Sequence, residues 1–101
     1  MKYKISLKAE QDLESIWLYT IENWSQVQAK AYLNLIFKEI EFASEHPLMC
    51  PDASHLRKYY RYTRVKSHLI FFRYYSPKRK IEIVRILHSK SSLDNLLQTK
   101  S

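Results

Sequence analysis

The sequence predicts an α+β domain in which an N-terminal strand and a helical hairpin pack on one face of a mainly antiparallel sheet, in the order β-α-α-β-β-β. Three observations predict this fold. Apolar residues recur at helical spacing through two long stretches of the N-terminal half. Three apolar, strand-like runs follow in the C-terminal half, and their short connections favour antiparallel neighbours. The length of 101 residues suits one domain, which we expect to span residues 1–101 with a short polar tail from about residue 89.

The first half is predicted to form a short strand and two helices. Apolar and polar residues alternate over residues 3–7, as in a strand, and Ser6 is placed to cap the helix that follows. A second helix is predicted from Ser25, because Ser25 and Gln28 form a capping box. It ends before Pro47, since the residue before a proline avoids the helical region. The link between the helices is so short that they must lie antiparallel. The stripes expected to face the core are Ala9, Leu13, Ile16, Trp17, Thr20 and Trp24 on the first helix, and Ala29, Tyr32, Leu33, Ile36, Ile40 and Ala43 on the second.

The second half is predicted to form three strands, at about residues 57–65, 67–75 and 80–88, after a loop at 47–56. The central parts of the last two strands are apolar on both faces, which is typical of strands that are covered on both sides. The helices cover only one face, so we expect the tail or a partner protein to cover the other. One helical turn in the tail is predicted by Leu93, Leu96 and Leu97.

Composition narrows the classes of function. The formal net charge of +7 favours an acidic partner, which is nucleic acid, an acidic protein or an anionic surface, over the alternative that the charge only keeps the protein in solution. Glycine is absent, which excludes P-loop and dinucleotide-binding fingerprints. The single cysteine, Cys50, has no neighbouring base and no partner for an intramolecular disulfide, which fits a reducing cytoplasm. We predict no signal peptide, no membrane span, no cofactor and no metal site.

Both helices carry apolar residues away from their predicted core stripes. These residues are Leu18 and Tyr19 on the first helix, and Ala31, Leu35 and Phe42 on the second. Isolated apolar side chains on a surface are common, but here a helix face and a sheet face both show an excess. We therefore predict a docking surface for another protein chain.

Four segments, in order and over nearly the whole chain, resemble the ParE toxins of the RelE/ParE toxin–antitoxin superfamily. ISLKAEQDLESIWLYTIENW resembles the opening strand and helix, AKAYLNLIFKEIEFASEHP the second helix, and YRYTRVKSHLIFFR and IVRILHSKSSLD the sheet. The resemblance implies a type II toxin that inhibits DNA gyrase by binding and is neutralised by a ParD-like antitoxin. The matching positions in the sheet are Arg61, Ser67, His68, Ile70, Phe71, Arg73, Arg85, Ile86, Leu87 and His88.

Two positions depart from the family pattern. The family usually has glycine where Lys66 stands, so Lys66 must find a non-glycine turn or adopt a positive φ. The usual Arg-x-Asp after the closing histidine reads here as Ser89-Lys-Ser-Ser-Leu-Asp94. Lys90 is therefore the candidate to replace the arginine, and Asp94 is displaced.

RelE-like members of the superfamily cut mRNA in the ribosome, and this activity is the alternative function. It needs a base, an acid and cations around the phosphate, for which the candidates are Arg61, Arg85, His88 and Lys90. The tyrosine or His-Tyr pair that RelE-like members carry past the last strand is missing. Strand alternation also predicts Arg85 and His88 on opposite faces. We therefore expect a toxin that is not an enzyme; a toxin that has lost its activity and only binds the antitoxin is a third alternative.

The other basic residues form two groups. His68 begins a strand and His88 ends its antiparallel neighbour, so we expect these two to lie together. With Arg73 and Arg85 they are predicted to be structural or target-binding. Basic and aromatic side chains interleave at Arg57, Tyr59, Tyr60, Arg61, Tyr62 and Arg64. Such a pattern can bind single-stranded nucleic acid or an acidic antitoxin segment. Because the resemblance implies an antitoxin, we favour the antitoxin and do not expect direct binding of nucleic acid.

Overall fold

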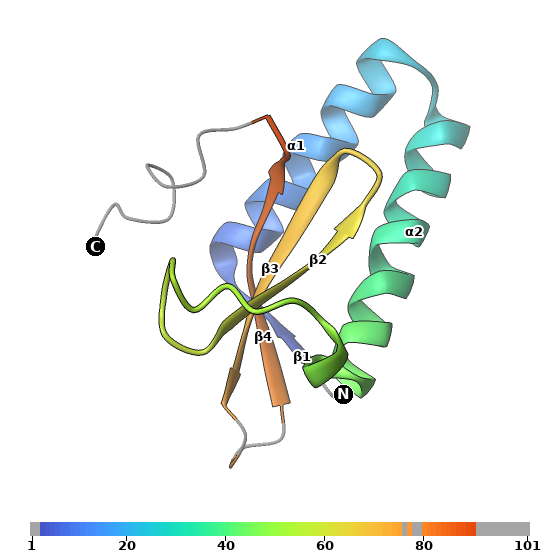
Figure 1. Ribbon diagram of the computed structural model, residues 1–101. Coiled ribbons are helices and arrows are strands. Elements are labelled where there is room, and N and C mark those ends of the chain that lie inside the picture. The colour runs from blue at the N-terminus through green and yellow to red at the C-terminus, as the bar shows by residue number, and fades with distance from the viewer. Residues whose placement is uncertain (1–2, 76, 78–79, 91–101) are drawn as a thin grey trace.

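The computed structural model describes residues 3–75, 77 and 80–90, and it has the predicted α+β architecture (Figure 1). The predicted helical turn in the tail lies outside these residues, as does Asp94. Both predicted helices and all four predicted strands are present, and the first strand is shorter than expected. The elements are β1 (Tyr3–Ile5), α1 (Leu7–Asn23), α2 (Gln26–Glu45), the 3-10 turn η1 (Pro47–Met49), β2 (Tyr60–Val65), β3 (His68–Tyr75) and β4 (Lys80–His88).

The four strands form one sheet in the order β1-β4-β3-β2, in which β1 runs parallel to β4 and the other pairs are antiparallel. β1 pairs with β4 only as far as Ile83. Beyond that point, the edge of β4 is hydrogen-bonded by the start of α1. Ser6 donates from its backbone N to the oxygen of Ile83 (2.9 Å) and from Oγ to the oxygen of Val84 (3.1 Å). Asp12 accepts from the backbone N of Ile86 (2.8 Å).

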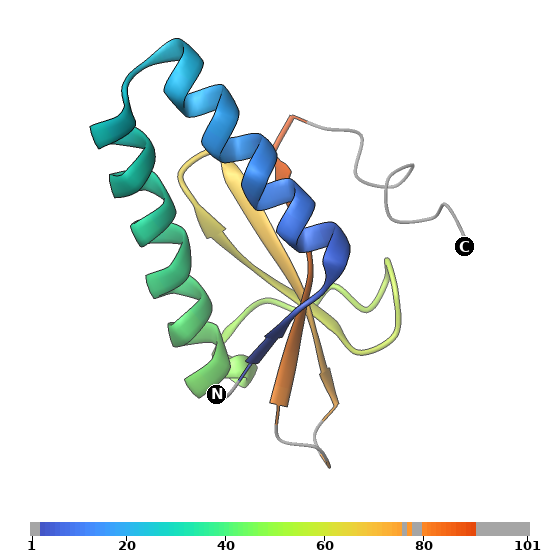
Figure 2. The ribbon, with the colours of Figure 1, turned by 180° about the vertical axis from the view of Figure 1, so that it is seen from behind.

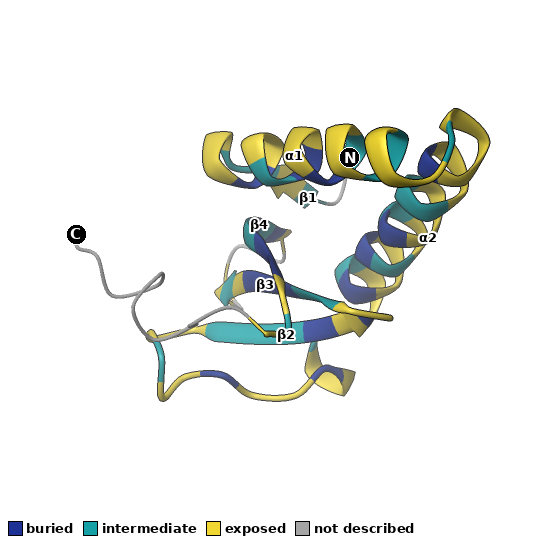
Figure 3. Ribbon diagram, turned by 90° about the horizontal axis from the view of Figure 1, so that it is seen from above, coloured by how far each residue is buried: buried dark blue, intermediate teal, exposed yellow. Residues whose placement is uncertain are grey.

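The helical hairpin lies on one face of the sheet, with α1 over β4 and α2 beside β2 (Figures 2 and 3). Both predicted caps are confirmed. Ser6 Oγ accepts from the backbone N of Ala9 (3.1 Å), and Ser25 Oγ accepts from the backbone N of Gln28 (3.0 Å). α2 ends at Glu45, immediately before the His46-Pro47 pair, as predicted.

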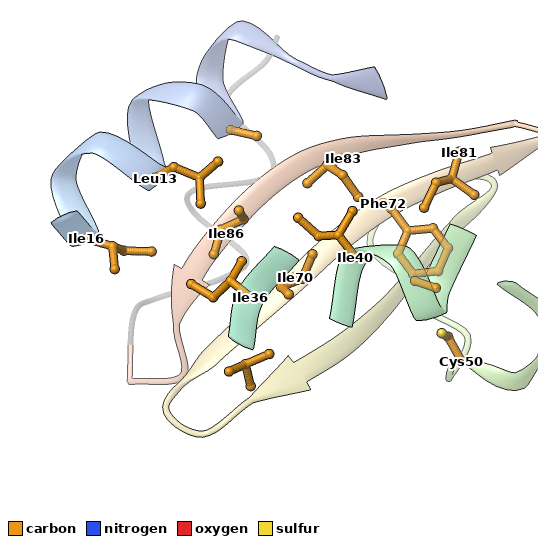
Figure 4. Packing of buried hydrophobic residues seen from close by; sticks show 13 residues of the cluster. Leu13, Ile16, Ile36, Ile40, Cys50, Ile70, Phe72, Ile81, Ile83 and Ile86 are labelled. Atoms are coloured by element: carbon orange, nitrogen blue, oxygen red, sulfur yellow. The ribbon is translucent and has the colours of Figure 1, made fainter. Parts of the chain in front are cut away.

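The main core fills the space between the helices and the face of the sheet that they cover, here called the front face (Figure 4). The predicted stripe of α2 is confirmed, with its alanines and isoleucines buried and Tyr32 and Leu33 half-buried. The stripe of α1 is confirmed through Ile16. Trp24 contradicts it, because its side chain is 67% exposed. Trp24 follows the last residue of α1 with φ −135° and ψ −98°, so it has left the helical path that would carry it to the core. Fully buried residues of this core include Ile36, Ile40, Ile70, Phe72, Ile81 and Ile83.

A loop covers the opposite face of the sheet, here called the back face (Figure 3). The chain between η1 and β2 runs beside β2, where Ala53 N donates to Tyr60 O (2.9 Å) and Tyr62 N donates to Pro51 O (3.1 Å). The expectation that only the tail or a partner could cover this face was therefore wrong. The loop has no periodic pattern that could have revealed this role. The back-face cluster comprises buried Ala53, Phe71 and Leu87, with Leu56, Tyr60, Tyr62, Leu69 and Val84 packed against them.

Two residues other than glycine have a positive φ, one at each end of β2. Lys66, in the turn between β2 and β3, has φ 50°. Tyr59, immediately before β2, has φ 69°. The sequence left two choices for Lys66, and the chain takes the one with positive φ, which costs energy for a residue that has a Cβ.

Candidate functional site

A groove of about 850 Å³ opens where the helical hairpin meets the β2–β3 turn and the end of β4. Its walls come from the C-terminal part of α1 and the N-terminal part of α2, and its floor comes from the strands. Three segments that are far apart in sequence therefore build one concave surface. Residues that line it include Tyr19, Trp24, Ala31 and Leu35 from the helical hairpin, and His68 and His88 from the strands.

The helix walls of the groove are apolar and open to water. Tyr19 is 64% exposed and Leu35 is 42% exposed. Of the five helix residues predicted to dock a partner, Tyr19, Ala31 and Leu35 line the groove, whereas Leu18 and Phe42 do not. Exposed apolar side chains gathered in a concave surface are typical of a binding site.

Trp24 is a groove residue that the sequence analysis placed in the core. Trp24 stands directly before Ser25, the cap of α2, and a residue in the link between two helices no longer follows the core stripe of the first. This position could have indicated from the sequence that Trp24 lies outside the core. Lys66 and Tyr32 also line the groove. Tyr32 had been predicted only as a core residue, and its half-burial allows it to serve both the core and the groove.

The floor of the groove contains a hydrogen-bonded tyrosine–histidine pair. The Tyr32 hydroxyl lies 2.7 Å from Nδ1 of His68 and 3.1 Å from the backbone oxygen of Val65. Burial lowers the pKa of His68, and the neighbouring His88 lowers it further, against an opposing effect of Asp12. Burial also raises the pKa of Tyr32. Both side chains are therefore neutral near pH 7, and they present hydrogen-bonding groups rather than charges.

His68 and His88 lie side by side, as the sequence predicted. They are partners across β3 and β4, and their ring centroids are 5.4 Å apart in an edge-to-face arrangement. Nδ1 of His88 accepts from the backbone N of Lys90 (3.1 Å). Among residues 3–75, 77 and 80–90, no three His, Cys, Asp or Glu side chains gather where they could hold a metal ion.

Arg85 is bound to an acidic residue of α1. Its Nε and Nη2 atoms donate to Oδ2 (2.8 Å) and Oδ1 (3.0 Å) of Asp12, and this contact raises the pKa of Arg85. Sequence alternation had predicted Arg85 and His88 on opposite faces. A β-bulge lies just before Arg85, where Phe71 lies opposite Arg85 and Phe72 opposite Ile83, so that β4 carries one extra residue; from Arg85 to His88 the pairing is regular.

The extra residue, Val84, packs in the back-face cluster. The guanidinium of Arg85 reaches Asp12 of α1, whose carboxylate also accepts from the backbone N of Ile86 at the edge of β4. The pairing thus agrees with the predicted opposition, because Arg85 lies opposite back-face Phe71 and His88 lies opposite His68 on the front face. The sequence analysis missed Asp12 as a partner of Arg85. The two residues are 73 positions apart, and no local pattern connects them.

Arg61 is engaged at a different place. Its Nη1 donates to the backbone oxygen of Cys50 (2.7 Å), which holds the loop of the back face at its start. Cys50 itself is 4% exposed, and burial raises the pKa of its thiol, so the thiolate is disfavoured. The structure thus gives Arg61 a partner in the loop rather than a place in the groove.

The four residues proposed for a ribonuclease are not gathered at one point. His88 lies in the groove and Lys90 contacts it through the backbone, whereas Arg85 is paired with the groove residue Asp12 and Arg61 is bound to the backbone of Cys50. The arrangement places the two imidazoles of His68 and His88 together, while both predicted arginines are held by other groups.

The interleaved basic and aromatic residues of β2 divide between the two faces. Tyr60 and Tyr62 pack in the back-face cluster, whereas Arg61 has the partner described above. Arg64 is exposed, and its Nε donates to the oxygen of Lys66 (2.7 Å). Tyr59 lies against Tyr75 at the start of β2. The sequence presented these residues as one run, and the strand separates them.

Comparison with known proteins identifies the protein family to which this chain is similar. Residues 3–93 match the family model described as the ParE toxin of the type II toxin–antitoxin system parDE. The chain is 36% identical over 86 residues to a toxin named ParE1 from Caulobacter vibrioides, which covers 85% of this chain and 86% of that protein. It is 31% identical over 96 residues to a toxin named ParE1 from Mycobacterium tuberculosis, which covers 95% of this chain and 97% of that protein.

A solved structure has the same fold. A chain of the chromosomal ParDE toxin–antitoxin system from P. aeruginosa superposes with a TM-score of 0.75 and 17% sequence identity, over 89% of this chain and 97% of that one. At this level of identity the likeness supports the fold alone, and it agrees with the strand, helical hairpin and sheet described above.

Proposed function

The chain belongs to the ParE toxin family of type II toxin–antitoxin systems, and on that premise we propose that it inhibits DNA gyrase by binding and is neutralised by a ParD-like antitoxin. The family match over residues 3–93 is the observation that carries this proposal. Gyrase acts on DNA in the cytoplasm, so we place the toxin there.

The groove is where we propose that the antitoxin binds. Its helix walls expose large apolar side chains, Tyr19, Trp24 and Leu35, which an amphipathic segment of a partner can bury. Its floor carries the neutral Tyr32–His68 pair, which can exchange hydrogen bonds with a polar side chain of that segment. Leu18, Phe42 and the basic–aromatic residues of β2 lie outside the groove, so this proposal does not use them.

We propose that binding, not catalysis, accounts for toxicity. A metal-free cleavage of RNA needs cations next to the phosphate. Arg85 is held by both carboxylate oxygens of Asp12, and Arg61 by the carbonyl of Cys50. Using either arginine in a reaction would require breaking a contact that supports the fold.

The gyrase proposal is tested with the purified full-length chain, gyrase, ATP and relaxed plasmid. We expect loss of supercoiling and accumulation of protein-linked DNA breaks, and both should disappear when the ParD-like antitoxin encoded beside the toxin is added first. If excess toxin leaves supercoiling unchanged and traps no breaks, gyrase is not the target.

The groove proposal is tested with a matched pair of substitutions. Leu35→Glu places a charge in the groove wall, whereas Leu18→Glu places the same charge on an exposed leucine outside it. We expect Leu35→Glu to weaken antitoxin binding by at least about tenfold, since a buried unpaired charge costs several kcal/mol, and Leu18→Glu to leave it nearly unchanged. Equal effects of the two variants would remove the groove from the interface.

The two alternatives give different results. A ribosome-dependent endonuclease would cleave translated mRNA, as detected by primer extension, and the cleavage would be lost in His88→Ala with the fold intact. An inactive antitoxin-binding module would bind the antitoxin with normal affinity, yet permit growth when it is expressed alone. The gyrase toxin stops growth without cutting mRNA.

A further inference from the structure

A second exposed surface lies at the end of the sheet away from the groove. It is built from two rows of back-face residues that cross neighbouring strands. In one row Tyr60 lies opposite Arg73, and Arg73 lies opposite Glu82. In the other, Tyr75 lies opposite Lys80. Directly paired residues of antiparallel strands point to the same face, so each row presents its side chains together.

Two tyrosines of this surface form an aromatic pair. The ring centroids of Tyr59 and Tyr75 are 4.9 Å apart with an interplanar angle of 62°, and the rings remain 39% and 36% exposed. Tyr59, which has a positive φ, is held there by its backbone oxygen, which accepts from Tyr74 N (2.9 Å). The pair therefore offers ring surface to water where β2 begins and β3 ends.

Three cationic residues share this end of the sheet with the aromatic pair. Nζ of Lys58 lies 5.3 Å from the centroid of the Tyr59 ring, and Arg73 and Lys80 are exposed on the adjoining strands. Glu82 is the acidic side chain in the same rows, and it is half-buried. Three cations and one carboxylate give the surface a net positive charge. We call Lys58, Tyr59, Arg73, Tyr75 and Lys80 the basic–aromatic end.

The basic–aromatic end is separate from the groove. Along β3, His68 lies in the groove and Tyr75 lies seven residues further on, which corresponds to about 23 Å of extended strand. The two surfaces also lie on opposite faces, because His68 contacts α2 on the front face whereas Tyr75 belongs to the back-face rows. A segment bound in the groove would leave this end open.

The sequence run at residues 57–64 favoured an antitoxin over nucleic acid, but the strands regroup its residues and bring Tyr59 together with Tyr75 beside Lys80. We propose that this basic–aromatic end binds single-stranded nucleic acid. Exposed aromatic rings next to lysine and arginine provide the two contacts that such a strand needs, stacking for its bases and positive charge for its phosphates. A duplex keeps its bases stacked on each other, so only its phosphates would be attracted to the cations. An acidic peptide would be attracted in the same way, but it has no base to stack on the two tyrosines.

This inference requires neither gyrase nor the antitoxin, so its test is independent of the proposed function. Fluorescence anisotropy measures binding of the full-length chain to a labelled single-stranded oligonucleotide, as DNA and as RNA, over a series of salt concentrations. We expect a dissociation constant in the range of about 10⁻⁴–10⁻⁶ M, weakening with salt by about 0.7 log units per log unit of salt for each phosphate neutralised. Comparing DNA with RNA identifies which strand is preferred, and a duplex should bind more weakly than either.

Two variants separate charge from stacking. Arg73→Ser/Lys80→Ser should weaken binding and reduce the salt slope by about 1.4, that is, two phosphate contacts. The matched control is Lys30→Ser/Lys38→Ser, which removes two exposed lysines from α2 and should keep most of the slope. Tyr75→Ser should weaken binding with little change of slope, Tyr75→Trp should retain it, and Tyr19→Ser is the control for an exposed tyrosine in the groove.

Circular dichroism and thermal melting confirm that each variant is folded. The inference is overturned if the α2 control loses as much affinity as Arg73→Ser/Lys80→Ser, since binding would then follow net charge alone. It is also overturned if polyglutamate of equal charge displaces the labelled oligonucleotide as effectively as unlabelled oligonucleotide does. The same conclusion follows if Arg73→Ser/Lys80→Ser keeps its affinity for the oligonucleotide and loses affinity for the antitoxin. Either of these two results would assign the surface to an acidic protein.

Discussion

The two faces of the sheet are covered by different kinds of structure. On the front face, two long helices bury a continuous core that includes Ile36, Ile40 and Phe72. On the back face, a loop without regular structure buries Ala53, Phe71 and Leu87, and leaves several aromatic side chains half-exposed. The difference shows that a regular layer seals a sheet more completely than a loop does. The surfaces available for binding lie at opposite ends of the sheet: the groove between the helical hairpin and the β2–β3 turn, and the basic–aromatic end beyond the loop.

Adjacent phenylalanines test this comparison directly. Phe71 and Phe72 are both buried, but they point to the back and front faces respectively. We expect Phe72→Ala to lower the free energy of unfolding by about 4–5 kcal/mol and Phe71→Ala by about 3 kcal/mol. The helices cannot move into the cavity at Phe72, whereas the loop can partly collapse over Phe71. Urea denaturation measures both values, and equal losses would mean that the loop is as rigid a cover as the helices.

The ion pair of Arg85 with Asp12 sharpens the comparison, because it ties α1 to the edge of β4 on the helix side. Asp12→Ala removes the acceptor of three hydrogen bonds and leaves a half-buried guanidinium without its partner. We expect a loss of about 2–3 kcal/mol in the free energy of unfolding.

The exposed acid Glu14, on the same helix, provides the control as Glu14→Ala. Its loss should stay within about 0.5 kcal/mol. In the double variant Asp12→Ala/Arg85→Leu, part of the stability should return, since no unpaired cation remains. If the double variant is as unstable as the sum of the two single variants, the residues do not act as a pair.

The regular elements of the front face could be predicted from sequence, because local patterns encode them. Ser6, Ser25 and the His46-Pro47 pair mark helix boundaries within a few residues of where they act. Nothing local encodes the cover of the back face or the partnership of Asp12 with Arg85, which depend on contacts between distant segments. Part of the groove followed from pattern, through Tyr19, Ala31 and Leu35, the apolar groove residues away from the core stripes. Trp24 did not, since its place depends on how the chain leaves α1.

His68 makes the front face sensitive to pH. Burial and His88 lower its pKa, against the effect of Asp12, so the folded protein favours the neutral ring. The stabilisation is complete above the ordinary histidine pKa of about 6.5 and is lost as the pH falls below it, because the unfolded chain then takes up a proton that the folded chain does not. We expect the urea midpoint to fall as the pH is lowered through this range. The corresponding loss in the free energy of unfolding should be smaller than the loss caused by Asp12→Ala.

His68→Asn removes the titrating ring, and its amide can still hydrogen-bond the Tyr32 hydroxyl. The groups that face His68 are Tyr32, His88 and Asp12. The pH dependence of the urea midpoint should flatten in His68→Asn. In His88→Gln it should become shallower, since one of the two causes that lower the pKa of His68 is gone. A His68→Asn profile parallel to that of the wild type would assign the acid sensitivity to other groups.

The two residues with positive φ give the smallest effect and separate strain from packing. Lys66 holds φ 50° in the turn between β2 and β3, and its side chain is exposed. Lys66→Gly removes the clash of Cβ in this region, so we expect the free energy of unfolding to rise by about 0.5–1 kcal/mol, while Lys66→Ala should bring no gain. Tyr59→Gly relieves the same kind of strain at φ 69°, but it also removes the ring that packs against Tyr75, and we expect a net loss of stability. Thermal melts of the three variants measure these changes in stability relative to the wild type. A gain at Tyr59 would mean that its ring contributes little to the fold, whereas no gain at Lys66 would mean that the turn holds its positive φ without cost.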